Sequence, residues 1–146
     1  MSGFLLLKKS LHSPYSPPFF MPHFFTETTV PDFSSFGEDD TPPIPNFIGP
    51  YRIAGLLNRG GMSFLYLGVD PEKFEPIAIK ILLPRFLQHR EMTGNFLREA
   101  EIIRIADHPN IVKLYHQGKW ANGLYIATEF IKGISLKQFI MKKMLN

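Results

Sequence analysis

Three sets of residues in the chain are of types that could act on a bound anion. Gly60 and Gly61 form a glycine pair in a polar turn, Lys80 ends a short apolar run, and Glu99 lies in a helical pattern. Glycine lets the backbone approach a ligand closely, because no side chain blocks it. Taken alone, each set has an ordinary explanation: a hairpin turn, a lysine in solvent and a solvated carboxylate. The order and spacing of the three sets along the chain must therefore decide whether they form an anion-binding site.

The elements that would position these residues follow from the apolar patterns. Short apolar runs bounded by turn residues predict five strands, over residues 51–57, 64–68, 77–82, 111–115 and 124–128. A helix is expected from about residue 94 to residue 106, capped by Thr93 and ended by His108-Pro109. Ser135 is expected to cap a short last helix. Short hairpin connections imply an α+β fold, with an antiparallel sheet and one main helix packed on it.

In this order the motifs resemble the amino-terminal lobe of a serine/threonine protein kinase, from residue 51 to about residue 140. The motifs are the turn at residues 58–63, Ile77-Ala78-Ile79-Lys80, Arg98-Glu99-Ala100, His108-Pro109-Asn110-Ile111-Val112 and the run 124–131. The similarity is greatest to the bacterial, eukaryotic-like (Hanks-type) group. The resemblance implies a five-stranded antiparallel lobe over residues 49–146, truncated before the second lobe.

The turn departs from the family's glycine-rich pattern, Gly-x-Gly-x-x-Gly-x-Val. The aligned positions hold Asn58, Gly60, Ser63 and Leu65, so only the middle glycine matches. In the family that glycine lets the backbone approach the phosphates of ATP most closely. Asn58 tolerates left-handed geometry better than most residues do. The missing glycines put the affinity for phosphate in question, whereas the predicted fold does not depend on them.

The resemblance gives Lys80 and Glu99 the catalytic positions of this lobe. In the family the strand lysine contacts the α- and β-phosphates, and a helix glutamate orients it by an ion pair. Ala78 matches the small residue that lies over the adenine. Glu101 competes with Glu99, but it is out of register with the Arg98-Glu99-Ala100 signature.

The run that leads into the kinase hinge supplies the other expected contacts to ATP. Thr128 falls at the gatekeeper position, and the backbone of Glu129 and Ile131 would bind the adenine. The complete set of nucleotide-binding residues expected from the resemblance is Leu57, Asn58, Gly60, Gly61, Ser63, Leu65, Ala78, Lys80, Thr128, Glu129 and Ile131.

The family's catalytic base and metal ligands have no counterpart in the chain. His89-Arg90-Glu91 only superficially resembles a catalytic loop, since it precedes the helix, and Asp32-Phe33 lies far upstream of the lobe. We therefore expect no metal ligands here, and magnesium only with a complete kinase domain.

Two functions remain open at this point. In the first, the chain is the ATP-binding lobe of a serine/threonine kinase, inactive alone, whose partners are ATP, a protein substrate and a second lobe on a separate chain. In the second, it is a non-catalytic, pseudokinase-like interaction module, such as a secreted effector. Asn58 and Ser63 fit the second function, because a lobe that no longer binds phosphate can lose those glycines.

Residues 1–48 form a separate compositional block. Nine of the 13 prolines fall within the first fifty residues, and proline interrupts helices and central strands alike. We expect a disordered extension. The alternatives are a docking segment built on Phe19, Phe20, Phe24 and Phe25, and a true start at Met21.

The totals exclude several classes of protein. The chain has no cysteine, which excludes disulfides and thiol chemistry. The net charge is only +3, with no run of four basic residues, so nucleic acid is not an expected partner. No apolar stretch is long enough for a membrane span, and Phe4-Leu5-Leu6-Leu7 is too short for a cleaved signal. We expect a cytoplasmic protein, or one secreted by an unrecognised signal.

Overall fold

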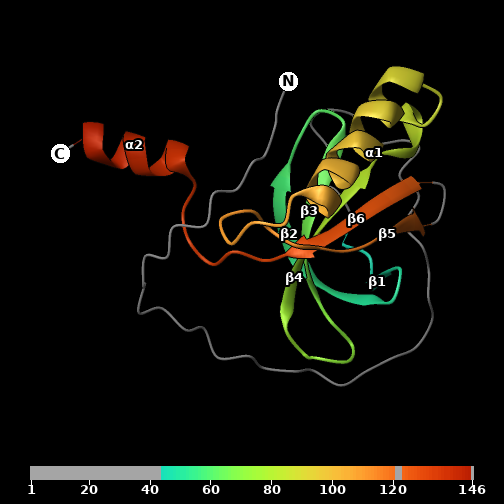
Figure 1. Cartoon of the computed structure of the whole chain (residues 1–146), viewed down its shortest axis with the longest axis horizontal. Helices are drawn as coiled ribbons and strands as arrows, with labels where there is room; N and C mark the ends of the chain where they lie inside the picture. The colour runs from blue at the N-terminus through green and yellow to red at the C-terminus, as the bar shows by residue number, and fades with distance from the viewer. Residues whose placement is uncertain (1–43, 121–122, 146) are drawn as a thin grey trace.

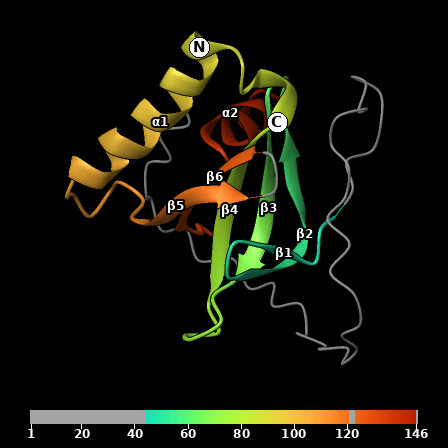
Figure 2. The ribbon, with the colours of Figure 1, turned by 90° about the vertical axis from the view of Figure 1, so that its right-hand side faces the viewer.

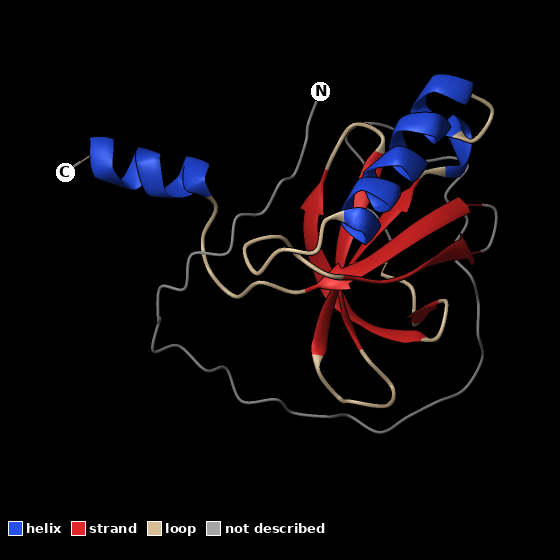
Figure 3. Ribbon diagram, in the orientation of Figure 1, coloured by secondary structure: helices blue, strands red, loops and turns tan. Residues whose placement is uncertain are grey.

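The computed structural model describes residues 44–120 and 123–145 as one antiparallel sheet with two α-helices (Figures 1 and 3). The expectations for residues 1–43 lie outside the described residues. The elements are β1 (Phe47–Ile48), β2 (Tyr51–Arg59), β3 (Ser63–Val69), β4 (Pro76–Leu82), a 3₁₀ turn (Pro84–Phe86), α1 (Arg90–Ile105), β5 (Leu114–Trp120), β6 (Gly123–Glu129) and α2 (Leu136–Met144).

The six strands follow the order β1-β2-β3-β4-β6-β5, and every neighbouring pair is antiparallel. The sheet is curled, as Figure 2 shows, and α1 runs beside its β6 and β5 edge. Central strand β4 pairs with β3 on one side and β6 on the other, so Lys80 lies opposite both Leu65 and Ile126. The α+β class and the antiparallel sheet are therefore confirmed, but the sheet has six strands and not the five predicted.

The alternation of side chains along β4 divides the core into two clusters. Ile77, Ile79 and Ile81 are buried in the larger cluster, together with Phe64 and Tyr66 of β3. The residues between them point to the other face, as the two-residue period of a strand requires. There Leu82 packs against Ile126 of β6 and against two residues of α1, Phe96 and Ala100. The same face carries Lys80, so the smaller cluster supports the candidate site.

Gly68 of β3 is required by the packing of the larger cluster. A Cβ at this position would lie 2.5 Å from Cδ1 of Ile79 on the neighbouring strand. That distance is well inside van der Waals contact, so a side chain would displace β3 from β4 or force Ile79 into another rotamer.

The main helix starts four residues earlier than the sequence patterns predicted. α1 begins at Arg90, with His89 as its N-cap residue, so the prediction that Thr93 caps the helix was wrong. The Thr93 hydroxyl instead donates to the carbonyl oxygens of Phe86 and Leu87, at 3.3 and 3.2 Å. Thr93 thus ties the first turn of α1 to the 3₁₀ turn, a tertiary role that a capping rule does not foresee.

Two strands also differ from expectation. The predicted strand at residues 111–115 is shifted, because β5 runs from Leu114 to Trp120 and its exposed polar residues hide the strand pattern. Backbone pairing with β6 forms this edge strand instead. The sheet also gains β1, whose Ile48 is fully buried. The folded region thus includes Phe47 and Ile48, which the sequence pattern assigned to the extension.

The last helix begins as predicted. The Ser135 hydroxyl accepts a hydrogen bond from the Gln138 N–H at 3.2 Å, and the Gln138 side chain accepts one from the Ser135 N–H at 2.8 Å. This reciprocal pair is a capping box. No residue of α2 is buried, and Figure 1 shows the helix standing apart from the sheet.

Candidate functional site: a cavity between the glycine turn and α1

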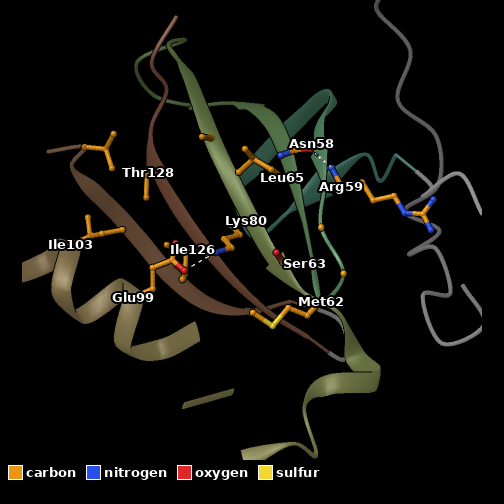
Figure 4. A pocket seen from close by; sticks show the side chains of 14 residues that line it. Asn58, Arg59, Met62, Ser63, Leu65, Lys80, Glu99, Ile103, Ile126 and Thr128 are labelled. Atoms are coloured by element: carbon orange, nitrogen blue, oxygen red, sulfur yellow. Dashed lines mark hydrogen bonds and ion pairs between the residues drawn. The ribbon is translucent and has the colours of Figure 1, made fainter. Parts of the chain in front are cut away.

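A cavity of about 320 Å³ opens on the face of the sheet that carries Lys80 (Figure 4). The β2–β3 turn covers it on one side, and α1 bounds it on the other. Its lining combines backbone of the turn with apolar side chains and one ion pair. The lining residues are Asn58, Arg59, Gly60, Gly61, Met62, Ser63, Leu65, Ala78, Lys80, Glu99, Ile103, Val112, Ile126 and Thr128.

The ion pair joins the sheet to α1. Nζ of Lys80 donates to Oε2 of Glu99 at 2.6 Å, and their side chains are only 18% and 28% exposed. Nζ of Lys80 also lies 5.9 Å from the centre of the Phe96 ring, within cation–π range. A positive charge held in this way is fixed in position and ready to meet an anion in the cavity. The structure thus brings together the two residues predicted to pair.

Glu101, the competing candidate, serves a different purpose. It makes two hydrogen bonds to Arg104, at 2.6 and 2.9 Å, on the exposed side of α1. The hydrogen bonds from Arg104 lower the pKa of the Glu101 carboxyl. Because Glu101 pairs with Arg104 outside the cavity, Glu99 is the carboxylate that pairs with Lys80.

The turn between β2 and β3 is closed by its own backbone. The Gly60 N–H donates to the Ser63 carbonyl oxygen at 2.8 Å, and the Asn58 side chain accepts from the Arg59 N–H at 2.8 Å. A Cβ at Gly60 would lie 3.2 Å from the Ser63 carbonyl oxygen, whereas one at Gly61 would meet nothing within 4 Å. Gly60 is therefore the more tightly packed glycine of the turn, and it is also the one that matches the family pattern.

The hinge-like end of β6 is held by β5 and the segment before it. The Glu129 N–H donates to the Lys113 carbonyl oxygen at 2.9 Å, and the Glu129 carboxylate accepts from the Lys113 N–H at 3.3 Å. Since this N–H is engaged, an adenine contact from Glu129 would have to use the carbonyl group. Thr128 lines the cavity one residue earlier.

Eight of the eleven residues predicted to bind nucleotide line the cavity; Leu57, Glu129 and Ile131 do not. The lining also includes residues that the sequence analysis missed as site residues: Arg59, Met62, Ile103, Val112 and Ile126. Two of these five residues could have been predicted from their spacing in the sequence. Ile103 follows Glu99 by one helical turn, and Ile126 precedes Thr128 by two strand positions, so each shares a face with a predicted residue.

Two negative findings concern only the described residues. No group of three or more His, Cys, Asp or Glu side chains within residues 44–120 and 123–145 could hold a metal ion. Over the same residues, neither helix is long and apolar enough to cross a membrane.

Comparison with known proteins decides the family. The family model that describes the protein kinase domain matches residues 51–146 of the sequence. The chain belongs to the protein kinase family. It is 37% identical over 92 residues to the serine/threonine-protein kinase PrkC of Bacillus subtilis, covering 63% of this chain and 14% of PrkC. It is also 37% identical over 95 residues to the probable serine/threonine-protein kinase PknB of Lactococcus lactis, covering 64% and 15%.

Solved kinase structures agree with the fold. The crystal structure of the PknI kinase domain of Mycobacterium tuberculosis matches with a TM-score of 0.57 and 26% identity, over 66% of this chain and 39% of that one. The chain therefore corresponds to the amino-terminal lobe of a bacterial Hanks-type serine/threonine kinase, and it spans about a seventh of the curated relatives named above.

Proposed function

We propose that this chain supplies the ATP-binding lobe of a serine/threonine protein kinase, with the phosphates of ATP held between the glycine turn and Lys80. The observation that carries the proposal is the Lys80–Glu99 ion pair at 2.6 Å, in a cavity bounded by backbone of Gly60 and Gly61. An ammonium held by a carboxylate, next to glycine backbone, suits a polyanion. The apolar lining from Leu65, Ala78 and Ile126 suits the adenine ring.

In this proposal ATP supplies the phosphoryl group, and this chain's residues bind and orient it. Lys80 neutralises phosphate charge, Glu99 keeps Lys80 in place, and Thr128 borders the adenine. The sequence has no counterpart of the family's catalytic loop, and no group of three or more His, Cys, Asp or Glu side chains among the described residues could hold a metal ion. In this proposal, phosphoryl transfer to a protein serine or threonine therefore needs a second lobe. Such a lobe, covalently continuous or on a separate chain, is a proposed partner, and magnesium would bind only in its presence.

The test is thermal unfolding of the 146-residue protein with and without ATP. A ligand present at ten times its Kd stabilises the folded state by about 1.4 kcal/mol, which raises the Tm of a small domain by several degrees. We expect this shift in the parent protein and in Lys119→Ala, which removes an exposed lysine of β5. We expect its loss in Lys80→Ala. An equal shift in both variants would overturn the proposed role of Lys80.

A second assay tests phosphoryl transfer. Residues 44–146 would replace the matching lobe of PrkC, and incorporation of phosphate from labelled ATP would be measured with a protein substrate. We expect transfer by this chimaera and none by its Lys80→Ala variant. Circular dichroism of both chimaeras establishes that they are folded, and a folded chimaera that binds ATP without transfer would contradict a catalytic function.

The second candidate is a non-catalytic interaction module. Asn58 and Ser63 favour it, because they stand where the family places glycines that admit phosphate. This candidate predicts no ATP-dependent shift in Tm for the parent protein, so the thermal experiment separates the two functions.

A further inference from the structure

The tip of the glycine turn is attached to the core by more than its own hairpin. The Leu83 N–H donates to the Met62 carbonyl oxygen at 3.1 Å, which extends the β3–β4 pairing one residue beyond the Ser63–Leu82 pair. On the outside of the turn, Nη2 of Arg85 donates to the Gly61 carbonyl oxygen at 3.3 Å. The turn is thus tied to the segment that leads from β4 into α1.

The Met62 side chain makes a third attachment, and this one is apolar. It packs against the smaller core cluster, in which Leu82 and Ile126 of the sheet meet Phe96 and Ala100 of α1. Figure 4 shows Met62 extending from the turn back toward α1, on the same side of the sheet as the Lys80–Glu99 pair. The thioether side chain is unbranched and adapts to such irregular gaps.

The same cluster supports the ion pair. The Phe96 ring lies 5.9 Å from Nζ of Lys80, and Glu99 follows Phe96 by three residues, so both residues lie on one face of α1. The position of α1 that lets Glu99 reach Lys80 is therefore fixed by packing in which Met62 takes part. Contacts that share partners in this way are energetically coupled.

We infer that Met62 is a positioning residue that couples the glycine turn to α1 and, through α1, to the Lys80–Glu99 pair. Its consequence for ATP rests on the proposed function; the coupling itself does not. Loss of the Met62 side chain leaves a gap between the turn and the cluster, so α1 and the turn become more mobile together.

Hydrogen–deuterium exchange of the 146-residue protein tests the coupling without any ligand. Met62→Ala is expected to raise exchange at least about threefold in peptides from α1, roughly thirty residues away in sequence, while β5 and β6 stay protected. Met62→Leu, which conserves volume, is expected to restore protection of α1. Met144→Ala, in the exposed part of α2, is the matched control and should change nothing in α1. Unchanged exchange in α1, or an equal rise throughout the sheet, overturns the inference.

Nucleotide affinity then tests the consequence for the site. In a double-mutant cycle, Met62→Ala is expected to weaken ATP binding about tenfold in the parent but much less in Glu99→Gln, where the pair is already broken. Additive losses would overturn the coupling to the ion pair. Absence of ATP binding by the parent, together with faster exchange in α1 of Met62→Ala, would contradict the proposed function and leave the coupling established.

Discussion

The ammonium of Lys80 on β4 lies 2.6 Å from Oε2 of Glu99 on α1, and this pair joins the central strand to the helix packed on it. Both side chains are mostly buried, so each charge has lost much of its hydration. The opposite charge of the partner now stabilises it in place of water. The pair is therefore a structural tie as well as a proposed site for phosphate. Its two roles can be separated by measuring stability without ligand.

Glu99→Gln is expected to destabilise the protein by about 1–3 kcal/mol, between the values for exposed and fully buried pairs, because Lys80 keeps its charge and loses its partner. The measurement is the free energy of unfolding in urea. Glu101→Gln is the matched control two residues away, where the pair with Arg104 is exposed, and should cost much less. Equal losses for the two variants would show that the Lys80–Glu99 pair contributes no more stability than an exposed pair does.

Two glycines are expected to respond to alanine with opposite signs. Gly68→Ala should destabilise the protein by about 1–3 kcal/mol, since the new Cβ would lie 2.5 Å from Cδ1 of Ile79. Gly94→Ala should stabilise it by about 0.5–1 kcal/mol, because Gly94 lies within α1 with open space around the added Cβ. Both values come from urea unfolding. A loss of stability in Gly94→Ala would contradict the open environment.

Local rules explain why part of the fold could be predicted from the sequence. The Ile-rich apolar run at residues 77–82, bounded by turn residues, marks a strand because it depends only on neighbours in the chain. The capping box of Ser135 and Gln138 is equally local. β5 could not be placed in this way, because its pairing with β6 leaves its polar residues exposed and its apolar pattern weak.

The same distinction applies to the site. Lys80 and Glu99 were predicted because a motif fixes each of them, and the structure brings them together. Met62 and Val112 line the cavity through tertiary packing of the turn and of the segment before β5, which no local pattern specifies. Thr93 shows the converse, since a residue suited to a cap is used to tie α1 to the 3₁₀ turn.

Ser135→Ala is expected to loosen α2 selectively. The substitution removes the acceptor for the Gln138 N–H and should cost the helix about 0.5–2 kcal/mol. α2 has no buried residue to compensate, so its amides should exchange faster while those of the sheet do not change. Lys137→Ala, an exposed change in the same turn, is the control. Unchanged exchange of α2 in Ser135→Ala would mean that the capping box does not limit its opening.

The buried tyrosines predict how stability depends on alkaline pH. Burial raises the pKa of the Tyr66 hydroxyl above its ordinary value near 10, and the pKa values of Tyr51 and Tyr125 are raised in the same direction. The folded state therefore holds these protons more tightly than the unfolded chain does. The stability that results is fully present below about pH 10 and is lost as the pH rises further.

Tyr66→Phe removes the largest of these contributions, because Tyr66 is fully buried against Phe64 in an edge-to-face contact with ring centres 6.4 Å apart. The measurement is the free energy of unfolding in urea at about pH 8 and about pH 11, in parent and variant. The parent should lose more stability between the two values than Tyr66→Phe does. Tyr115→Phe, on the exposed side of β5, should keep the parental loss. An identical loss in parent and Tyr66→Phe would contradict the raised pKa of this hydroxyl, since lysine titration is common to all three proteins.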